Sequence, residues 1–169
     1  MEKYLDDEIL IVTKTDLKAY ITYANKDFLN IVNCKEEEIL GKNHNIIRNK
    51  DMPKAVFKLL WEKLKKEEEV FAFVKNNTFD NSFYWVYANI SPSYDANNKL
   101  IGYYSVRRKI NENAKDIIIS IYKKLLEIEQ NSGVIKSYEY LFSLLEKNNI
   151  CYDEFVIKLQ KEEIKDVKF

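Results

Sequence analysis

Glycine is scarce in this chain: only 3 of the 169 residues are Gly, and 2 are Pro. The sequence contains neither GxGxxG nor a Walker motif. It therefore lacks the glycine-rich loops that hold phosphates in Rossmann-type and P-loop proteins. Cysteine is equally rare, and Cys34 and Cys151 do not form a CxxC pair. This usage predicts two reduced thiols in a cytoplasmic protein.

Net charge is missing as well, because 27 Lys and Arg residues balance 27 Asp and Glu residues. This balance argues against nucleic-acid binding, which relies on a basic surface. No apolar run approaches the roughly 18 residues of a membrane-spanning helix, and the acidic start, MEKYLDDEIL, does not resemble a signal peptide. We therefore expect a cytoplasmic protein without direct membrane insertion. With no nucleophile–base pair and no paired carboxylates in a predicted cleft, we do not expect an enzyme.

The sequence does contain a series of short β-type runs on either side of a helical region. Their apolar, β-branched and aromatic residues predict strands over residues 8–13, 20–23, 70–74, 83–91 and 100–110. Short helices are predicted over residues 27–32, with Asn25 as the cap, and 35–40, with Gly41 closing the second. Together these elements predict an α+β fold, a five-stranded antiparallel sheet with helices on one face.

After residue 110 the pattern becomes that of amphipathic helices. Three are predicted, over residues 111–130, 134–147 and 152–160. We therefore divide the chain into an α+β domain, residues 1–110, and a C-terminal helical extension, residues 111–169. The extension either docks on its own sheet, self-associates in a homodimer or binds a partner protein, and the sequence leaves these alternatives open.

One stretch, residues 41–66, combines a polar loop with an apolar helix. Pro53 suits the first turn of the helix because it has no N–H to leave unpaired, and Asp51 is expected to cap the helix. Four apolar side chains recur with the spacing of one helix face: Phe57, Leu60, Trp61 and Leu64. Such a loop and helix could form the wall of a pocket for a ligand that is both aromatic and charged.

The order of elements and several motifs resemble the PAS domain of aerotaxis receptors. The matching motifs are TKTDLKAYITYAN (residues 13–25), ILGKNHNIIRNKDMPKAVFKLLW (39–61), VKN (74–76) and YWVYANISP (84–92). The resemblance implies a PAS fold over residues 1–110 and a non-covalently bound FAD that reports cellular redox state to the chemotaxis machinery. Aerotaxis receptors usually continue into a membrane segment and a signalling coiled coil. This chain instead resembles the split energy-taxis arrangement, in which a soluble PAS protein works beside a membrane-bound signal transducer. The resemblance thus implies recruitment to the inner membrane through that partner.

The resemblance also implies which residues bind the cofactor. The motif positions that remain are Arg48, Asp51, Trp61, Asn25 and Asn76. The expected FAD-binding set is completed by His44, Asn45, Phe57 and Trp85.

Each of these residues also has a simpler interpretation. Arg48 has the forked guanidinium that suits a phosphate, but it could equally pair with Asp51. Asn25 and Asn76 lie at strand ends, where an amide can bond to a flavin edge in both senses or merely cap a turn. Trp61 and Trp85 are also expected to pack in the core, whether or not they line a pocket.

Two further PAS chemistries are disfavoured by the sequence. His44 is the only histidine and cannot form a zinc site with these cysteines. Haem-binding PAS sensors carry their iron ligand on the long helix, whereas His44 precedes it, so we expect a structural or ligand-orienting role. Photoreceptor PAS domains use a Cys in the loop before that helix, and residues 41–51 contain none.

The chain departs from the aerotaxis motif at three places. Asn43 stands where the family often has Pro, Asn49 and Lys50 stand where it usually has His-Pro, and residues 80–82 replace a Gly-containing turn. The last two departures motivate an alternative function, a cofactor-free PAS adaptor that acts by protein contact. A haem-based gas sensor is the other alternative.

Overall fold

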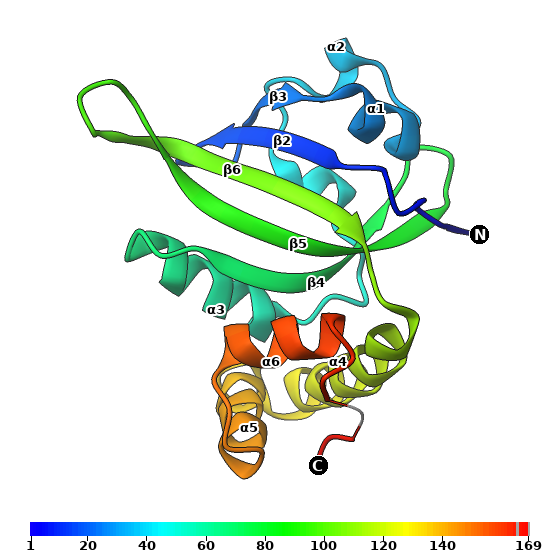
Figure 1. Ribbon diagram of the computed structural model, residues 1–169, viewed down its shortest axis with the longest axis vertical. Helices are drawn as coiled ribbons and strands as arrows, with labels where there is room; N and C mark the ends of the chain where they lie inside the picture. Colours follow the sequence, from blue (N-terminus) through cyan, green and yellow to red (C-terminus); the bar gives the residue numbers. More distant parts are fainter. Residues whose placement is uncertain (165, 169) are drawn as a thin grey trace.

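The computed structural model describes residues 1–164 and 166–168. A curved sheet lies at the centre, with one group of helices against its concave face and a second group below it (Figure 1). In chain order the elements are β1 (Glu2–Lys3), β2 (Ile11–Asp16), β3 (Ile21–Ala24), α1 (Lys26–Val32), α2 (Glu36–Ile39), the 3-10 helix η1 (His44–Ile47), α3 (Lys54–Lys65), β4 (Val70–Asn77), β5 (Phe83–Tyr94), β6 (Leu100–Lys109), α4 (Glu112–Ser132), α5 (Val134–Lys147) and α6 (Tyr152–Gln160).

The predicted antiparallel sheet is confirmed, with its five main strands in the order β4-β5-β6-β2-β3. The prediction missed a sixth strand: β1 pairs in parallel with the start of β5, placing Glu2 beside Phe83. Two residues are too few to show an alternation of apolar and polar side chains, so no local pattern announces this strand.

The predicted helices α1, α2 and α3 are also confirmed, with one correction at the start of α3, whereas η1 falls in the stretch predicted to be a polar loop. Asn25 caps α1 by accepting a hydrogen bond from the Phe28 N–H, and Gly41 follows α2 with φ +72°. Pro53, however, is the N-cap of α3 rather than its first residue, and it makes no side-chain capping bond. Asp51 does not cap this helix either, because its carboxylate pairs with the Lys75 ammonium at 2.6 Å.

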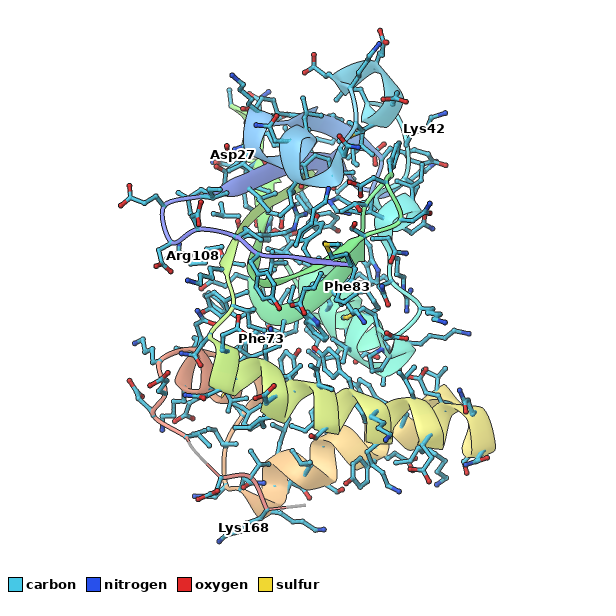
Figure 2. All side chains as sticks on the ribbon, turned by 90° about the vertical axis from the view of Figure 1, so that its right-hand side faces the viewer. Asp27, Lys42, Phe73, Phe83, Arg108 and Lys168 are labelled. Carbon is cyan, nitrogen blue, oxygen red and sulfur yellow. The ribbon has the colours of Figure 1, made fainter. Side chains whose placement is uncertain are left out.

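The C-terminal helices pack along the edge of the sheet, around β4 and the outer side of α3 (Figures 1 and 2). They satisfy backbone groups that the edge strand would otherwise expose. The Phe71 N–H donates to Asp153 Oδ1 of α6 at 3.3 Å, and the Tyr122 hydroxyl of α4 donates to the Phe73 carbonyl at 2.7 Å. Figure 2 shows Phe73 beside α4. The helical extension therefore docks on its own sheet.

Two groups of buried apolar side chains stabilise this arrangement. One joins α3, β4 and β5 to all three C-terminal helices, and the other lies under α1, α2 and η1. Because the first group crosses residue 110, the extension and the sheet domain share a core, and their division into two domains stays a prediction. Within the described residues, none of the helices is long and apolar enough to cross a bilayer.

Candidate functional site

A cavity of about 330 Å³ lies between the concave face of the sheet, η1 and α3. This volume is at the lower end of the about 300–1,000 Å³ that is typical of small-molecule sites. The sheet contributes inward-facing side chains from β2, β4, β5 and β6: Thr13, Thr15, Val74, Asn76, Ala88, Ile90, Tyr103, Ser105 and Arg107. The turn between β2 and β3 contributes Lys18 and Ala19, and the loop and helix α3 contribute Asn43, His44, Asn45, Arg48, Phe57, Leu60, Trp61 and Leu64.

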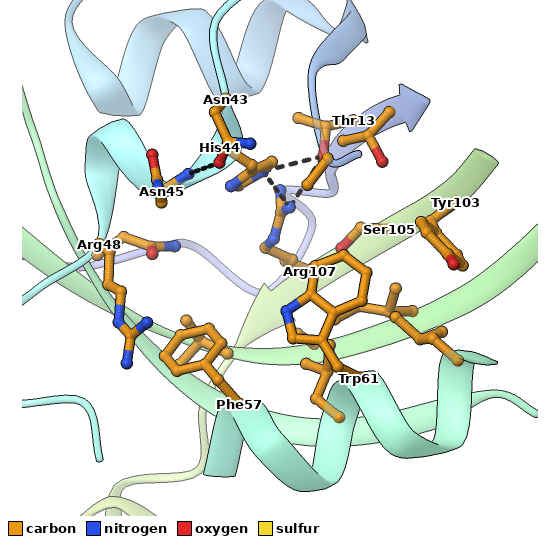
Figure 3. A pocket seen from close by; sticks show the side chains of 18 of the residues that line it. Thr13, Asn43, His44, Asn45, Arg48, Phe57, Trp61, Tyr103, Ser105 and Arg107 are labelled. Carbon is orange, nitrogen blue, oxygen red and sulfur yellow. Dashed lines mark hydrogen bonds between the residues drawn. The ribbon is translucent and has the colours of Figure 1, made fainter. Parts of the chain in front are cut away.

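The polar end of the cavity is built around Arg107 on β6 (Figure 3). Its side chain is 4% exposed, and its Nη2 donates to Thr13 Oγ1 at 2.9 Å and to His44 Nε2 at 2.7 Å. Thr13 stands opposite Ser105 in the β2–β6 ladder, one inward position from Arg107. Adjacent strands therefore fix this cluster in place, and η1 closes it from above.

His44 is neutral in this arrangement. A guanidinium can only donate, so the Nε2 atom that faces Arg107 must be the accepting nitrogen. Burial, together with the adjacent charge of Arg107, lowers the pKa of His44 to about 3. The imidazole thus orients the guanidinium, and its Nε2 is occupied by that hydrogen bond.

The guanidinium of Arg107 is not neutralised by any acidic group in the part of the chain that the structure describes. No Asp or Glu there lies within ion-pair distance of it, and its buried Nη1 has no hydrogen-bond partner among those residues. The buried hydroxyl of Ser105, on the same face of β6, is also unpartnered within that part of the chain. A buried donor left unpaired costs about 1–3 kcal/mol, and a charged one costs more. The cavity therefore has the chemistry of a site for a ligand with hydrogen-bond acceptors or negative charge.

The opposite side of the cavity is aromatic. Phe57 and Trp61 face the polar cluster from α3 (Figure 3), and the Trp61 ring meets Tyr103 edge-on with 5.6 Å between centroids. The guanidinium of Arg48 lies 3.8 Å above the centre of the Phe57 ring. Walls of this kind, aromatic on one side and hydrogen-bonding on the other, suit a flat heteroaromatic ring.

Asn45 and Arg48 also line a second, more open hollow at the surface, so the two spaces are adjacent. Lys50 and Lys54 contribute two more cations to this outer hollow. Partial burial lowers the pKa of Arg48, while the nearby carboxylate of Glu129 opposes that shift. The outer hollow can therefore receive an anionic extension of a ligand whose ring lies in the cavity.

Six of the nine residues expected to bind the cofactor line the cavity: His44, Asn45, Arg48, Phe57, Trp61 and Asn76. The other three lie elsewhere. The Asn25 side chain accepts from the Val12 N–H and donates to the Leu10 carbonyl, in addition to capping α1. Asp51 pairs with Lys75, as described above.

Trp85 lies on the opposite face of β5 from the cavity. It is 5% exposed, and its ring packs against Tyr122 of α4 with 6.1 Å between centroids. Trp85 therefore packs in the core, as its simpler interpretation predicted. Its contacts connect the sheet to the C-terminal helices and do not reach the cavity.

Four of the lining residues that the sequence did not indicate form or adjoin the polar cluster: Thr13, Tyr103, Ser105 and Arg107. All four occupy inward positions of β2 and β6. The signal that could have found them is the period of two in β6, which places residues 103, 105 and 107 on one face. A charged residue on the face that also carries Ser105 marks a buried polar site.

Asn49 departs from the family motif, but its side chain holds the loop before α3 in place. Asn49 is 8% exposed; its Nδ2 donates to Asn77 Oδ1 at 2.6 Å, and its Oδ1 accepts from the Asp51 N–H. Asn77 in turn donates to the carbonyl of Arg48 at 3.1 Å. These bonds connect the loop to β4 and hold Arg48 at the cavity.

Comparisons with known proteins concern the family and the fold. A family model described as the PAS fold matches residues 21–107. The aerotaxis receptor of Escherichia coli (strain K12) is 36% identical over 121 residues, which cover 72% of this chain and 24% of that receptor. The chain thus spans about a quarter of the receptor's length.

Two solved structures have a similar fold. A PAS domain from Colwellia psychrerythraea has a TM-score of 0.54 and 17% identity, over 62% of this chain and 89% of that chain. A light-oxygen-voltage domain studied with a flavin analogue has a TM-score of 0.54 and 20% identity, over 72% of this chain and 86% of that chain. At these identities the likeness concerns the fold.

Proposed function

The chain belongs to the PAS fold family, and from that premise we propose that it is a redox sensor that binds FAD non-covalently and signals to a separate membrane-bound chemotaxis transducer. Its similarity to the aerotaxis receptor supports a role in energy taxis. The partner is inferred from the resemblance to split energy-taxis systems. Such a partner must bind the oxidised and reduced sensor with different affinity, because otherwise no signal would pass.

The observation that carries the proposal is the guanidinium of Arg107, which no acidic group among the described residues neutralises, in a cavity with an aromatic wall. A flavin ring has carbonyl oxygens and ring nitrogens along one edge, and these accept hydrogen bonds from groups such as Arg107 Nη1 and the Ser105 hydroxyl. Its flat faces match the aromatic wall formed by Phe57 and Trp61.

When bound, the flavin supplies reversible electron transfer, and protein charges near its ring tune that chemistry. Arg107 presents a fixed positive charge in a buried place, which favours whichever state of the ligand is more negative. His44 holds this charge in position without sharing it, because the imidazole is neutral. The residues therefore favour reduction of the ligand.

Asn76 is the residue best placed to respond to a change in the ring. It is 4% exposed, lines the cavity and donates to the Tyr84 hydroxyl over a long 3.4 Å. Rotation of a side-chain amide exchanges the positions of its donating NH₂ group and its accepting oxygen. Asn76 lies three residues from Phe73 on β4, whose carbonyl accepts the Tyr122 hydroxyl of α4. This strand offers a route from the cavity to the C-terminal helices.

The test is the visible absorption spectrum of the full chain, purified from cells and then titrated with FAD. Flavin bands, or uptake of added FAD, are expected. A Soret band would instead indicate the haem sensor, and a colourless protein that takes up no FAD would indicate the cofactor-free adaptor. Either result would overturn the proposal.

A pair of tryptophan variants tests the site itself. Trp61→Ala removes a ring from the cavity wall and should weaken FAD binding about tenfold or more, since an aromatic contact and its buried area contribute at least about 1.4 kcal/mol. Trp85→Phe alters the opposite face of the sheet and should leave affinity unchanged. Equal affinities in wild type and Trp61→Ala would contradict the site.

A further inference from the structure

The first turn of α3 is capped from a distant part of the chain. The Ala55 N–H donates to Glu129 Oε1 of α4 at 2.8 Å, across 74 positions of sequence. The helix has no acidic residue in its own first turn, and its N-cap, Pro53, makes no side-chain bond. Glu129 therefore supplies the negative charge that the start of a helix favours.

The same carboxylate faces the cations of the outer hollow. That hollow is lined by Arg48, Lys50 and Lys54, and Glu129 is the acidic residue among its described lining residues. Glu129 is half-buried, and its charge acts on Arg48. Arg48 also lines the inner cavity. Glu129 is thus placed next to the position where a ligand held in the cavity would extend toward the surface.

We propose that Glu129 is a positioning residue that links dinucleotide binding to the docking of α4. This inference rests on the proposed function, and it concerns the diphosphate rather than the flavin ring. Glu129 lies near Arg48 at the outer hollow and holds the first turn of α3 when no dinucleotide is bound. The diphosphate of FAD introduces a second anion beside Arg48, and mutual repulsion weakens the contact between Glu129 and Ala55.

The linkage runs in both directions. If the diphosphate loosens the Glu129 contact, then the Glu129 contact must weaken binding of the diphosphate by the same factor. Glu129 lies one turn before Gly133, the residue between α4 and α5, and Gly133 has a φ of +87°. Because α5 packs against α3, release of the end of α4 changes the surface that the C-terminal helices present.

The experiment compares FAD with riboflavin, which has the same ring but no phosphate, on the full chain. Glu129→Gln keeps the size and the accepting oxygen but removes the charge. We expect this variant to bind FAD roughly fivefold more tightly or better and riboflavin as the wild type does. Glu127→Gln is the matched control, because Glu127 is exposed on the same helix and pairs with Lys124 at 3.0 Å.

Hydrogen exchange of the Ala55 amide, followed by NMR, provides a second measurement. In the wild type, FAD should accelerate this exchange and riboflavin should not. An unchanged ratio of FAD to riboflavin affinity in Glu129→Gln would overturn the linkage while leaving the flavin sensor intact. A wild type that binds neither compound would overturn the proposed function, and the linkage with it.

Discussion

Replacing Arg107 by Met should abolish flavin binding and leave the stability of the flavin-depleted protein close to that of the wild type. Arg107 is buried without a neutralising acid in the described residues, and one of its terminal nitrogens has no partner there. Met fills a similar volume with apolar atoms. A buried arginine that adds little to stability fits the ligand-binding role that we propose for it.

The magnitude follows from two opposing contributions. Leaving a buried charge without its partner costs about 3–5 kcal/mol, and the substitution removes this cost. It also removes two hydrogen bonds, to Thr13 and His44, and each is worth about 1.5–3 kcal/mol net for a charged donor. Thr13 Oγ1 and His44 Nε2 are 3.3 Å apart, so the hydroxyl can donate to the imidazole after the change and recover about 0.5–1.5 kcal/mol. These contributions nearly cancel, and the free energy of unfolding should stay within about 3 kcal/mol of the wild-type value.

Thermal denaturation of flavin-depleted wild type and variant at neutral pH measures this balance. For a chain of this size each kcal/mol moves the Tm by about 2–4 °C, so the Arg107→Met midpoint should lie within about 12 °C of the wild-type midpoint. Arg108→Met is the control, because Arg108 is the exposed neighbour on the same strand, and it should change neither Tm nor FAD binding. A Tm lower by more than about 12 °C for Arg107→Met, or retained FAD affinity, would refute the reasoning.

Three further changes test other parts of the structure. The pKa of His44 is about 3 in the folded protein, against about 6.5 in the unfolded chain. Its contribution to stability is therefore complete above about pH 6.5 and is lost as the pH falls toward 3, at about 1.4 kcal/mol per pH unit. In urea denaturation, His44→Gln should lose less stability than the wild type between about pH 6 and 4, and equal losses would contradict the neutral state of His44. Gly102→Ala would place a Cβ 1.9 Å from the Thr15 carbonyl oxygen and should destabilise the protein by about 1–3 kcal/mol or more; an unchanged urea midpoint would show that β2 and β6 are less closely apposed. Tyr122→Phe leaves the Phe73 carbonyl without its donor and should cost about 1–3 kcal/mol, which an unchanged Tm would exclude.

Most of the fold could be predicted from the sequence because its signals are local. The predicted helices over residues 134–147 and 152–160 coincide with α5 and α6. Their apolar spacing is regular, and breaks with positive φ at Gly133 and Asn149 separate them. The docking of these helices could not be predicted in the same way. It depends on contacts such as that between Asp153 and Phe71, which no local pattern encodes.

The site was harder to predict because it depends on which face each strand presents. A shift of one residue moves a side chain to the other side of a sheet. Trp85 and Arg107 illustrate this, because each lies in a strand that carries aromatic or charged residues on both of its faces. Only the register of the strands shows that Trp85 faces α4 and that Arg107 faces the cavity. Asn25 illustrates a second difficulty, because an amide that suits a ligand also suits a helix cap.

The position of α3 explains how one small domain could both bind a ligand and change an exposed surface. Phe57 and Trp61 face the cavity, while Val56 and Leu59 on the other side are packed with the C-terminal helices. Packed interiors do not deform continuously, so a movement of α3 that accommodates a ring must also be accommodated by α5. Because Glu129 holds the start of α3, the proposed linkage implies that the helix would respond to a bound ring along its length and to a bound diphosphate at its end. Riboflavin should therefore alter exchange along α3 and α5 while leaving the Ala55 amide protected, whereas FAD should alter both.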